Sequence, residues 1–266
     1  AEHAGPGFWF QLYVMRDRAF IERLIDRAKA ARCTALVLTL DLQILAQRHK
    51  DLKNGLSVPV KPTLASIANL LTKPSWCLAM AGTKRRQFGN IVGHVKGVDD
   101  MGSLSEWTTR QFDPTLNWAD VEWIKKRWGG KLILKGIQDV EDARLAVESG
   151  ADALIVSNHG GRQLDGAESS IRALPAVVDA VGSKIEVHMD GGVRSGQDVL
   201  KARALGAKGV YIGRAFIYGL GAGGEAGVTK ALQLIHKELD LTMALCGRTD
   251  INTIDPSILL PGTIPG

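Results

Sequence analysis

Short apolar runs, each followed by a helical pattern, constrain the fold of this chain more than any other feature. Six such runs are present, at residues 8–13, 35–39, 131–135, 153–157, 185–189 and 209–213. Continuous apolar strands are buried on both faces, which is typical of a parallel sheet covered by helices. The later runs recur every roughly 25 to 30 residues, a spacing that favours a (β/α)8 barrel over a propeller or a solenoid.

Helix start and stop signals support the same repeat. Asp139 precedes one helical pattern and Gly150 ends it, while Ser195 and Gly206 bound another. Asp and Ser are favoured N-caps, and Gly is favoured just beyond a helix C-terminus. We therefore expect an α/β chain folded as a TIM barrel, with about six of the eight β/α units. An open doubly wound sheet is the alternative, because six parallel strands also fit it.

The length of 266 residues suits one barrel domain spanning 1–266. A closed barrel needs two more strands, and the chain begins without Met directly before its first apolar run. We therefore expect N-terminal units to be missing from this chain, through cleavage, disorder or a second chain.

Composition narrows the compartment and the class of site. No stretch reaches roughly 18 to 20 uninterrupted apolar residues and no signal peptide opens the chain, so we expect a cytoplasmic protein. Cys33, Cys77 and Cys246 lie far apart, without the paired spacing of a zinc site or a disulfide framework. We expect no metal.

One long segment, 42–117, interrupts the repeat as an insertion. Within it, residues 48–98 hold nine basic side chains and one acidic side chain, a net charge of +8, against +5 for the whole chain. The remainder is slightly acidic, which argues against a nucleic-acid partner. The centre of the segment mixes apolar residues with positive charge, so we expect short helices that pack on a partner or on the inner face of a membrane. A solvated loop is the alternative.

The residues that follow the strands suggest the chemistry, because a barrel places its active site at the carboxyl ends of its strands. His159 and Arg162 share a glycine-rich turn, where an imidazole and a guanidinium can face one small ligand. An Arg can hold a carboxylate with two hydrogen bonds while a His accepts a proton beside it, which suits a 2-hydroxy acid. Lys135 ends one strand and needs an anionic partner there. Asp41 follows another strand at a similar depth and can steady an imidazolium, or can cap a helix.

Two glycine turns follow the last two strands. The first runs from Asp190 through Gly191, Gly192 and Val193 to Arg194, and the second is Gly213 with Arg214. Glycines let backbone N–H groups approach a phosphate, and the loops after barrel strands seven and eight often bind one. We therefore expect a phosphorylated cofactor or substrate.

Several motifs together resemble the family of FMN-dependent α-hydroxy-acid oxidases and dehydrogenases. They are SNHGGRQLDG at 157–166, LILKG at 132–136, DGGVRSGQD at 190–198 and YIGRA at 211–215. The resemblance extends from Trp9 to about Gly247, except for the long insertion. It implies a bound FMN, a small L-2-hydroxy acid as substrate, L-lactate before glycolate and mandelate, and an electron acceptor that is a quinone, a cytochrome or oxygen. It also implies a homo-oligomer.

The resemblance assigns roles to residues at matching positions. His159 is the catalytic base, Asp41 stabilises its protonated form, and Tyr13 hydrogen-bonds the substrate. Lys135 stabilises the negative charge that arrives on the flavin when it is reduced. The substrate carboxylate is bound by Arg162 and Arg48. The residues that contact the cofactor are Gln11, Thr39, Lys135, Ser157, Asp190, Gly191, Gly192, Val193, Arg194, Gly213 and Arg214.

The sequence also departs from the family. The first two strands, which supply further flavin contacts and another substrate tyrosine, are absent from this chain. His188 stands where a small or apolar residue is expected, and we interpret it as a packed strand histidine. A flavin-free phosphate-binding isomerase or synthase is an alternative function, but it leaves His159 and Arg162 without a role. A non-catalytic binding fragment is a third.

Overall fold

The computed structural model describes residues 7–44, 46, 48–54, 63–83, 88–91, 94–95, 107 and 110–262. The chain divides into two compact units, which we describe separately. The first comprises residues 1–13, 28–42 and 116–266, and the second comprises 14–27 and 43–115.

The first unit is built on a six-stranded sheet in which every strand pairs in parallel with the next one along the chain. Its strands are β1 (Trp9–Tyr13), β2 (Ala35–Thr39), β3 (Lys131–Ile137), β4 (Ala153–Val156), β5 (Glu186–Met189) and β6 (Gly209–Val210). A doubly wound sheet would reverse this order at a switch point, so that alternative is wrong. Among the described residues the sheet is not closed, and the fold is a partial TIM barrel with β1 and β6 at its edges.

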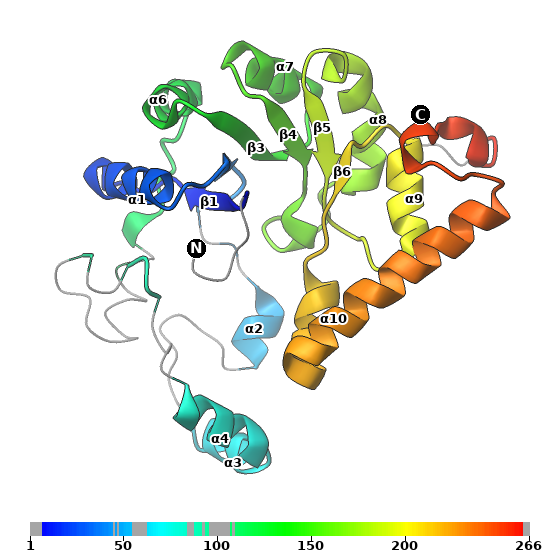
Figure 1. The fold of residues 1–266 in the computed structure, drawn as a ribbon. Helices are drawn as coiled ribbons and strands as arrows, with labels where there is room; N and C mark the ends of the chain where they lie inside the picture. Colours follow the sequence, from blue (N-terminus) through cyan, green and yellow to red (C-terminus); the bar gives the residue numbers. More distant parts are fainter. Residues whose placement is uncertain are drawn as a thin grey trace. The chain divides into compact units, whose positions relative to one another are not determined.

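Helices between the strands cover one face of the sheet (Figure 1). They include α6 (Trp118–Trp128), α7 (Val140–Glu148), α8 (Ser170–Val181) and α9 (Gly196–Ala204). The first two pack on β3, α8 packs on β4 and β5, and α9 packs on β6. A long helix, α10 (Arg214–Leu245), follows β6, packs on α9 and is kinked at Gly223 and Gly224. Three single-turn helices complete the unit: η1 (His159–Gly161), η2 (Ile251–Thr253) and η3 (Pro256–Ile258).

The predicted helix signals are confirmed. Asp139 caps α7 by accepting hydrogen bonds from two backbone amides, and Ser195 forms a capping box with Asp198 at the start of α9. Gly150 and Gly206 follow these helices with φ of 79° and 99°, the left-handed region that favours glycine. The predicted run at 209–213 forms only two strand residues, Gly209 and Val210.

The opposite face of the sheet carries the inward side chains of the barrel. Ala35, Val37, Ile133, Ala153 and Ile155 form a buried apolar cluster there. The register aligns Tyr13 with Thr39 and Thr39 with Lys135, so these three side chains continue the same face toward the carboxyl ends of the strands. The apolar cluster therefore underlies the end of the barrel where polar residues gather.

The second unit holds short helices from the insertion. They are α2 (His49–Lys53), α3 (Leu64–Leu71) and α4 (Pro74–Gly82), together with the first ten residues of α1 (Arg18–Ala30). The expectation of short helices is thus confirmed for the described part of 42–117. Among the described residues, no helix combines the length and apolarity needed to cross a bilayer.

An ion cluster at the amino-terminal end of the sheet gives a stability prediction. Asp152 accepts hydrogen bonds from Lys125 at 2.6 Å, Lys131 at 2.7 Å and the Leu132 amide at 2.9 Å. Burial by itself would raise the pKa of Asp152, but the hydrogen bonds from Lys125, Lys131 and Leu132 and the charge of Lys125 outweigh it and lower the pKa to about 2.

We expect Asp152→Asn to lower the free energy of unfolding by about 2 kcal/mol at pH 7. Because the folded pKa lies below the unfolded value, this stability is present above the unfolded pKa and is lost as pH falls toward about 2. Urea denaturation of both proteins at several pH values measures the difference. A difference that stays constant from pH 7 to pH 2 would contradict the assignment.

Candidate active site

A cavity of about 1010 Å3 lies at the carboxyl ends of the strands of the first unit. Residues from β1, β3, the loop after β4, the turn after β5 and the start of α10 line it together. Of the residues predicted from the sequence, these line the cavity: Gln11, Tyr13, Lys135, His159, Arg162, Asp190, Gly191, Gly192, Val193, Arg194, Gly213 and Arg214. The predicted convergence of a His, an Arg and two glycine turns is therefore present.

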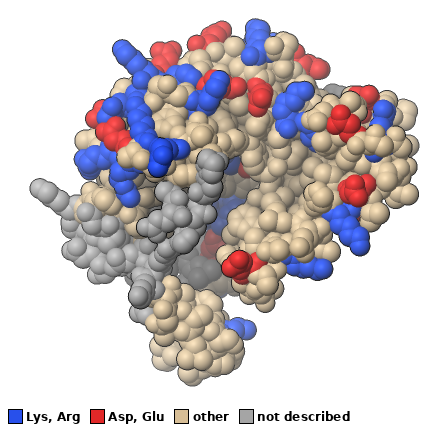
Figure 2. Space-filling model, viewed as in Figure 1, with Lys and Arg blue, Asp and Glu red and all other residues tan. Residues whose placement is uncertain are grey.

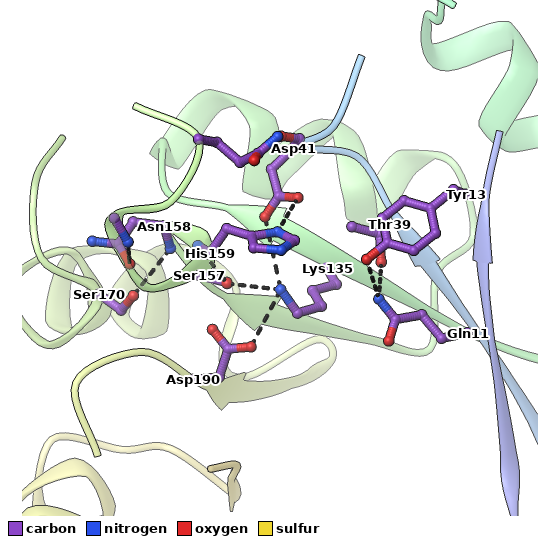
Figure 3. Close-up of polar contacts among 12 residues, drawn as sticks. Gln11, Tyr13, Thr39, Asp41, Lys135, Ser157, Asn158, His159, Ser170 and Asp190 are labelled. Carbon is purple, nitrogen blue, oxygen red and sulfur yellow. Dashed lines mark hydrogen bonds and ion pairs between the residues drawn. The ribbon is translucent and has the colours of Figure 1, made fainter. Parts of the chain in front are cut away.

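His159 pairs with Asp41 across two strand ends. Its Nδ1 lies 2.8 Å from Oδ1 of Asp41 (Figure 3). A carboxylate only accepts hydrogen bonds, so Nδ1 carries the proton and Nε2 is the ring nitrogen that can accept another. Gly136, with φ of 101°, allows Asp41 to approach, since a Cβ there would lie 2.8 Å from the Asp41 Cβ. The pair is thus arranged as a base with an orienting carboxylate.

The turn that carries His159 is strained and held by its neighbours. His159 has φ of 54°, and a non-glycine residue adopts this left-handed region at a cost. The Asn158 backbone N–H donates to Oγ of Ser170 at 3.2 Å, and the Asn158 side chain accepts from Gly161 N–H at 3.3 Å. The sequence did not predict this role of Asn158 and Ser170, because no sequence motif shows that these two residues, at opposite ends of the loop after β4, form a hydrogen bond.

Lys135 lies among three polar partners at the centre of the site (Figure 3). Its Nζ is 3.2 Å from Asp190 Oδ2, 3.7 Å from Asp41 Oδ2 and 2.9 Å from Oγ of Ser157. The anionic partner predicted for Lys135 is therefore confirmed, and there are two. Ser157 also accepts a hydrogen bond from the His159 amide at 3.0 Å, so one hydroxyl joins the lysine to the histidine turn.

Two buried carboxylate oxygens in this group still have acceptor capacity. Among the described residues, Oδ1 of Asp190 and Oδ2 of Asp41 are the buried side-chain atoms without a hydrogen-bond partner. Buried polar atoms are normally satisfied. A ligand that brings hydroxyl or N–H donors into the cavity would complete them.

The β1 side of the cavity presents the amide of Gln11 and the hydroxyl of Tyr13. Nε2 of Gln11 donates to Oγ1 of Thr39 at 2.8 Å and to the Tyr13 hydroxyl at 3.1 Å. Thr39 and Ser157 do not line the cavity, but both support residues that do. The Gln11 side chain carries both N–H donors and a carbonyl acceptor, so it can hydrogen-bond a planar heterocycle whose edge alternates acceptors and donors.

The opposite side of the cavity suits an anion. Gly191 and Gly192 have φ of 94° and 79°, and α10 begins after Gly213 with no side-chain hydrogen bond capping its N-terminus. Exposed N–H groups and the helix dipole at such a terminus favour phosphate. Arg214 donates to the Gly160 carbonyl at 2.9 Å, which ties this end to the histidine turn. The Arg194 amide donates to Asp198 at 2.9 Å, so Arg194 would meet a phosphate through its side chain only.

Arg48 and His188 are not among the residues that line the cavity. Arg48 belongs to the second unit, so the structure does not place it in the site. His188 is buried in β5, 7% exposed, as the interpretation of a packed strand histidine expects. Tyr211, which was not predicted, also lines the cavity.

Known proteins share this sequence and fold. A family model described as FMN-dependent dehydrogenase matches residues 1–261. L-lactate dehydrogenase from Caulobacter vibrioides (strain NA1000 / CB15N) is 48% identical over 95% of the chain and 66% of its own length. The corresponding enzyme of Pseudomonas syringae pv. syringae (strain B728a) is 44% identical over 98% of the chain and 68% of its length. The chain thus spans about two thirds of these relatives.

Solved structures agree with the sequence comparisons. The monotopic membrane protein (S)-mandelate dehydrogenase superposes with a TM-score of 0.90 at 35% identity, over 97% of the chain and 68% of that protein. A soluble mutant of the membrane-associated (S)-mandelate dehydrogenase from Pseudomonas putida gives a TM-score of 0.79 at 35% identity, over 97% of the chain and 66% of that protein. The chain belongs to the family of FMN-dependent dehydrogenases.

Proposed function

We propose that this chain provides most of the active site of an FMN-dependent dehydrogenase that oxidises L-lactate to pyruvate. The observation that carries the proposal is the His159–Asp41 pair, with Nδ1 and Oδ1 2.8 Å apart, in one cavity with Arg162 and the two glycine turns. A flavin-free isomerase would use the phosphate turns and Lys135 but not this pair, and it does not account for the family match.

The cavity residues fit FMN. The uncapped start of α10 and the side chains of Arg194 and Arg214 would hold the phosphate, and Oδ1 of Asp190, which has no partner, would accept from a ribityl hydroxyl. Gln11, which Thr39 orients by a hydrogen bond, would bind the ring edge, and Ser157 would orient Lys135. When bound, FMN supplies the acceptor for the hydride that leaves the substrate α-carbon.

The remaining polar residues would bind and deprotonate the hydroxy acid. Arg162 would hold the carboxylate, and Tyr13 would orient the substrate. Nε2 of His159 would take the hydroxyl proton as the α-hydrogen departs with its electron pair, leaving the 2-keto acid. Asp41 would stabilise the imidazolium so formed. Lys135 would offset the negative charge that develops on reduction.

Relatives support L-lactate over larger acids. The relatives named L-lactate dehydrogenase are 44–48% identical to this chain, against 35% for the (S)-mandelate dehydrogenase structures. For the electrons we propose a quinone as acceptor. An oxygen-using oxidase of glycolate or mandelate is the second candidate, since the fold by itself does not select the acceptor.

Anaerobic flavin reduction tests the proposal directly. The purified holoprotein should be yellow and should bleach with L-lactate faster than with glycolate or (S)-mandelate. Reoxidation should then be faster with a soluble quinone than with oxygen. A protein that is folded but colourless, and that retains no FMN once unbound FMN has been removed, would contradict the proposal. Bleaching by (S)-mandelate but not by L-lactate would show that the substrate is mandelate and not L-lactate.

The exposed helical hairpin of the second unit supports a peripheral membrane contact. Helices α3 and α4 contain no buried residue, and Leu64, Leu71, Trp76 and Leu78 are 87%, 80%, 55% and 74% exposed. The hairpin surface in view carries almost no charged side chain (Figure 2). Exposed apolar patches usually mark an interaction site, and this one lies within the segment of net charge +8. Apolar side chains flanked by cations suit an anionic bilayer.

We expect the double variant Leu71→Ser, Leu78→Ser to lose most binding to vesicles that contain anionic lipid. Two leucines removed from the interface cost several kcal/mol of transfer free energy, so the vesicle partition coefficient should fall at least roughly tenfold. Co-sedimentation measures it. The matched control is Leu245→Ser, Leu260→Ser, because those leucines are 88% and 74% exposed elsewhere. Equal losses in both variants, or none in either, would exclude this hairpin as the contact.

A further inference from the structure

The proposed chemistry leaves one buried titratable residue of the barrel, His188, without a role. In the sheet register His188 pairs with Ile155 on one side and with Gly209 on the other, so it shares the inward face of the apolar cluster. Gly209 makes room for the ring, because a Cβ there would lie 2.7 Å from His188 Nδ1. An imidazole has therefore been accommodated inside the barrel, beneath the cavity.

His188 links two other polar side chains. Its Nε2 lies 3.0 Å from Oε2 of Glu186, and its Nδ1 lies 2.5 Å from the hydroxyl of Tyr211. The rings of His188 and Tyr211 also stack, with centroids 5.6 Å apart. Glu186 is 68% exposed at its side chain, whereas Tyr211 lines the cavity. The three residues thus form a hydrogen-bonded chain from the amino-terminal end of β5 to the cavity.

The hydrogen bonds among these three residues run in one direction. Burial of Tyr211, together with the negative charges of Glu186 and Asp190, raises its pKa to about 12, so the phenol keeps its proton. A carboxylate only accepts hydrogen bonds, so Nε2 of His188 donates to Glu186, and in the tautomer that carries its proton on Nε2 the phenol donates to Nδ1. Each member is satisfied by the next, and the Tyr211 oxygen has lone pairs left to accept.

Tyr211 is placed to affect what binds above it. Its ring packs against the inward apolar cluster and against the edge of Trp9, at 6.2 Å between centroids. Asp190, two residues after His188, contributes to the raised pKa of Tyr211 and forms the ion pair with Lys135. Tyr211 and Asp190 line the same cavity, in which Oδ1 of Asp190 has no hydrogen-bond partner.

We propose that Glu186 and His188 are positioning residues that hold the phenol of Tyr211 against the FMN cavity. By fixing the phenol, they set the affinity for FMN and the environment of the bound flavin. The proposal rests on the proposed function, since it presumes that FMN fills this cavity. None of the three residues would transfer a proton to or from the substrate.

A pair of substitutions at His188 separates hydrogen bonding from volume. In the holoprotein, His188→Leu fills the space but cannot accept from Tyr211, so the FMN dissociation constant should rise about tenfold, which is about 1.4 kcal/mol. His188→Gln can accept from Tyr211 and donate to Glu186, and should stay within about twofold of the wild type. Quenching of free FMN fluorescence measures both. The visible absorption bands of the flavin should shift in His188→Leu and not in His188→Gln.

Tyr211→Phe provides a second test that deletes a single oxygen and so preserves the fold. It should weaken FMN binding as much as His188→Leu does, and the double variant should be no weaker than either single variant. Wild-type affinity and an unchanged flavin spectrum in both His188→Leu and Tyr211→Phe would overturn the inference, as would additive losses in the double variant. Failure of the wild type to bind FMN would instead overturn the proposed function.

Discussion

A His159→Gln variant is expected to bind FMN normally and to be reduced by L-lactate about 10² to 10⁴ times more slowly than the wild type. Glutamine can still accept a hydrogen bond, but it cannot take the hydroxyl proton. The His159 ring donates Nδ1–H to Asp41 at 2.8 Å and contributes to the cavity wall, so its loss should affect the proton transfer more than the binding of FMN. Stopped-flow measurement of flavin bleaching under anaerobic conditions gives the rate.

The matched control is His236→Gln, because His236 is an exposed histidine of α10. It should reduce at the wild-type rate. The flavin absorption spectrum of His159→Gln should also remain close to that of the wild type, which shows that the site is intact. A reduction rate within about threefold of the wild type in His159→Gln would remove the histidine from the mechanism, since a general base contributes far more.

Replacement of Lys135 is expected to have a second large effect, on the free energy of unfolding, because its ammonium separates two carboxylates. Nζ lies 3.2 Å from Asp190 and 3.7 Å from Asp41, and the three side chains are only 13%, 19% and 13% exposed, in that order. Lys135→Met would leave the two carboxylates without their cation, and removing one partner of a buried ion group costs about 3 kcal/mol. We expect the free energy of unfolding to fall by that amount in urea titrations. FMN reduction should slow as well, because no positive charge would remain at that point.

A second substitution tests the cause of that loss. In Lys135→Met, Asp190→Asn one of the facing charges is removed, so part of the stability should return relative to Lys135→Met alone. Lys184→Met, at an exposed lysine, should cost less than about 0.5 kcal/mol. If Asp190→Asn destabilises the lysine variant further, repulsion between carboxylates is not the cause.

The fold was largely predictable because its signals are local. Five of the six apolar runs form strands within two residues of the expected bounds, and the caps at Asp139 and Ser195 lie where the sequence placed them. Continuous burial and short-range capping do not depend on the rest of the chain. The length of β6 was missed, because the extent of strand pairing depends on the register with β5 and not on the apolar run alone.

Part of the site was predictable for a topological reason. The loops after parallel strands meet at one end of the sheet, so residues as far apart in sequence as Asp41 and His159 were expected to converge, and they pair at 2.8 Å. The contribution of Asn158 and Ser170 was not predictable, because it depends on the path of the loop after β4. Arg48 was predicted from a resemblance, and it falls in the separate second unit.

The sequence by itself determined where the strands lie along the chain and which polar residues follow each of them, since both are properties of local pattern. Only the tertiary structure decided the partners: that Lys135 lies between Asp41 and Asp190, and that His188 joins Glu186 to Tyr211. The reason is that such pairings depend on register and strand spacing, to which a hydrogen bond is sensitive within a few tenths of an ångström. A pattern along the chain carries no information at that precision.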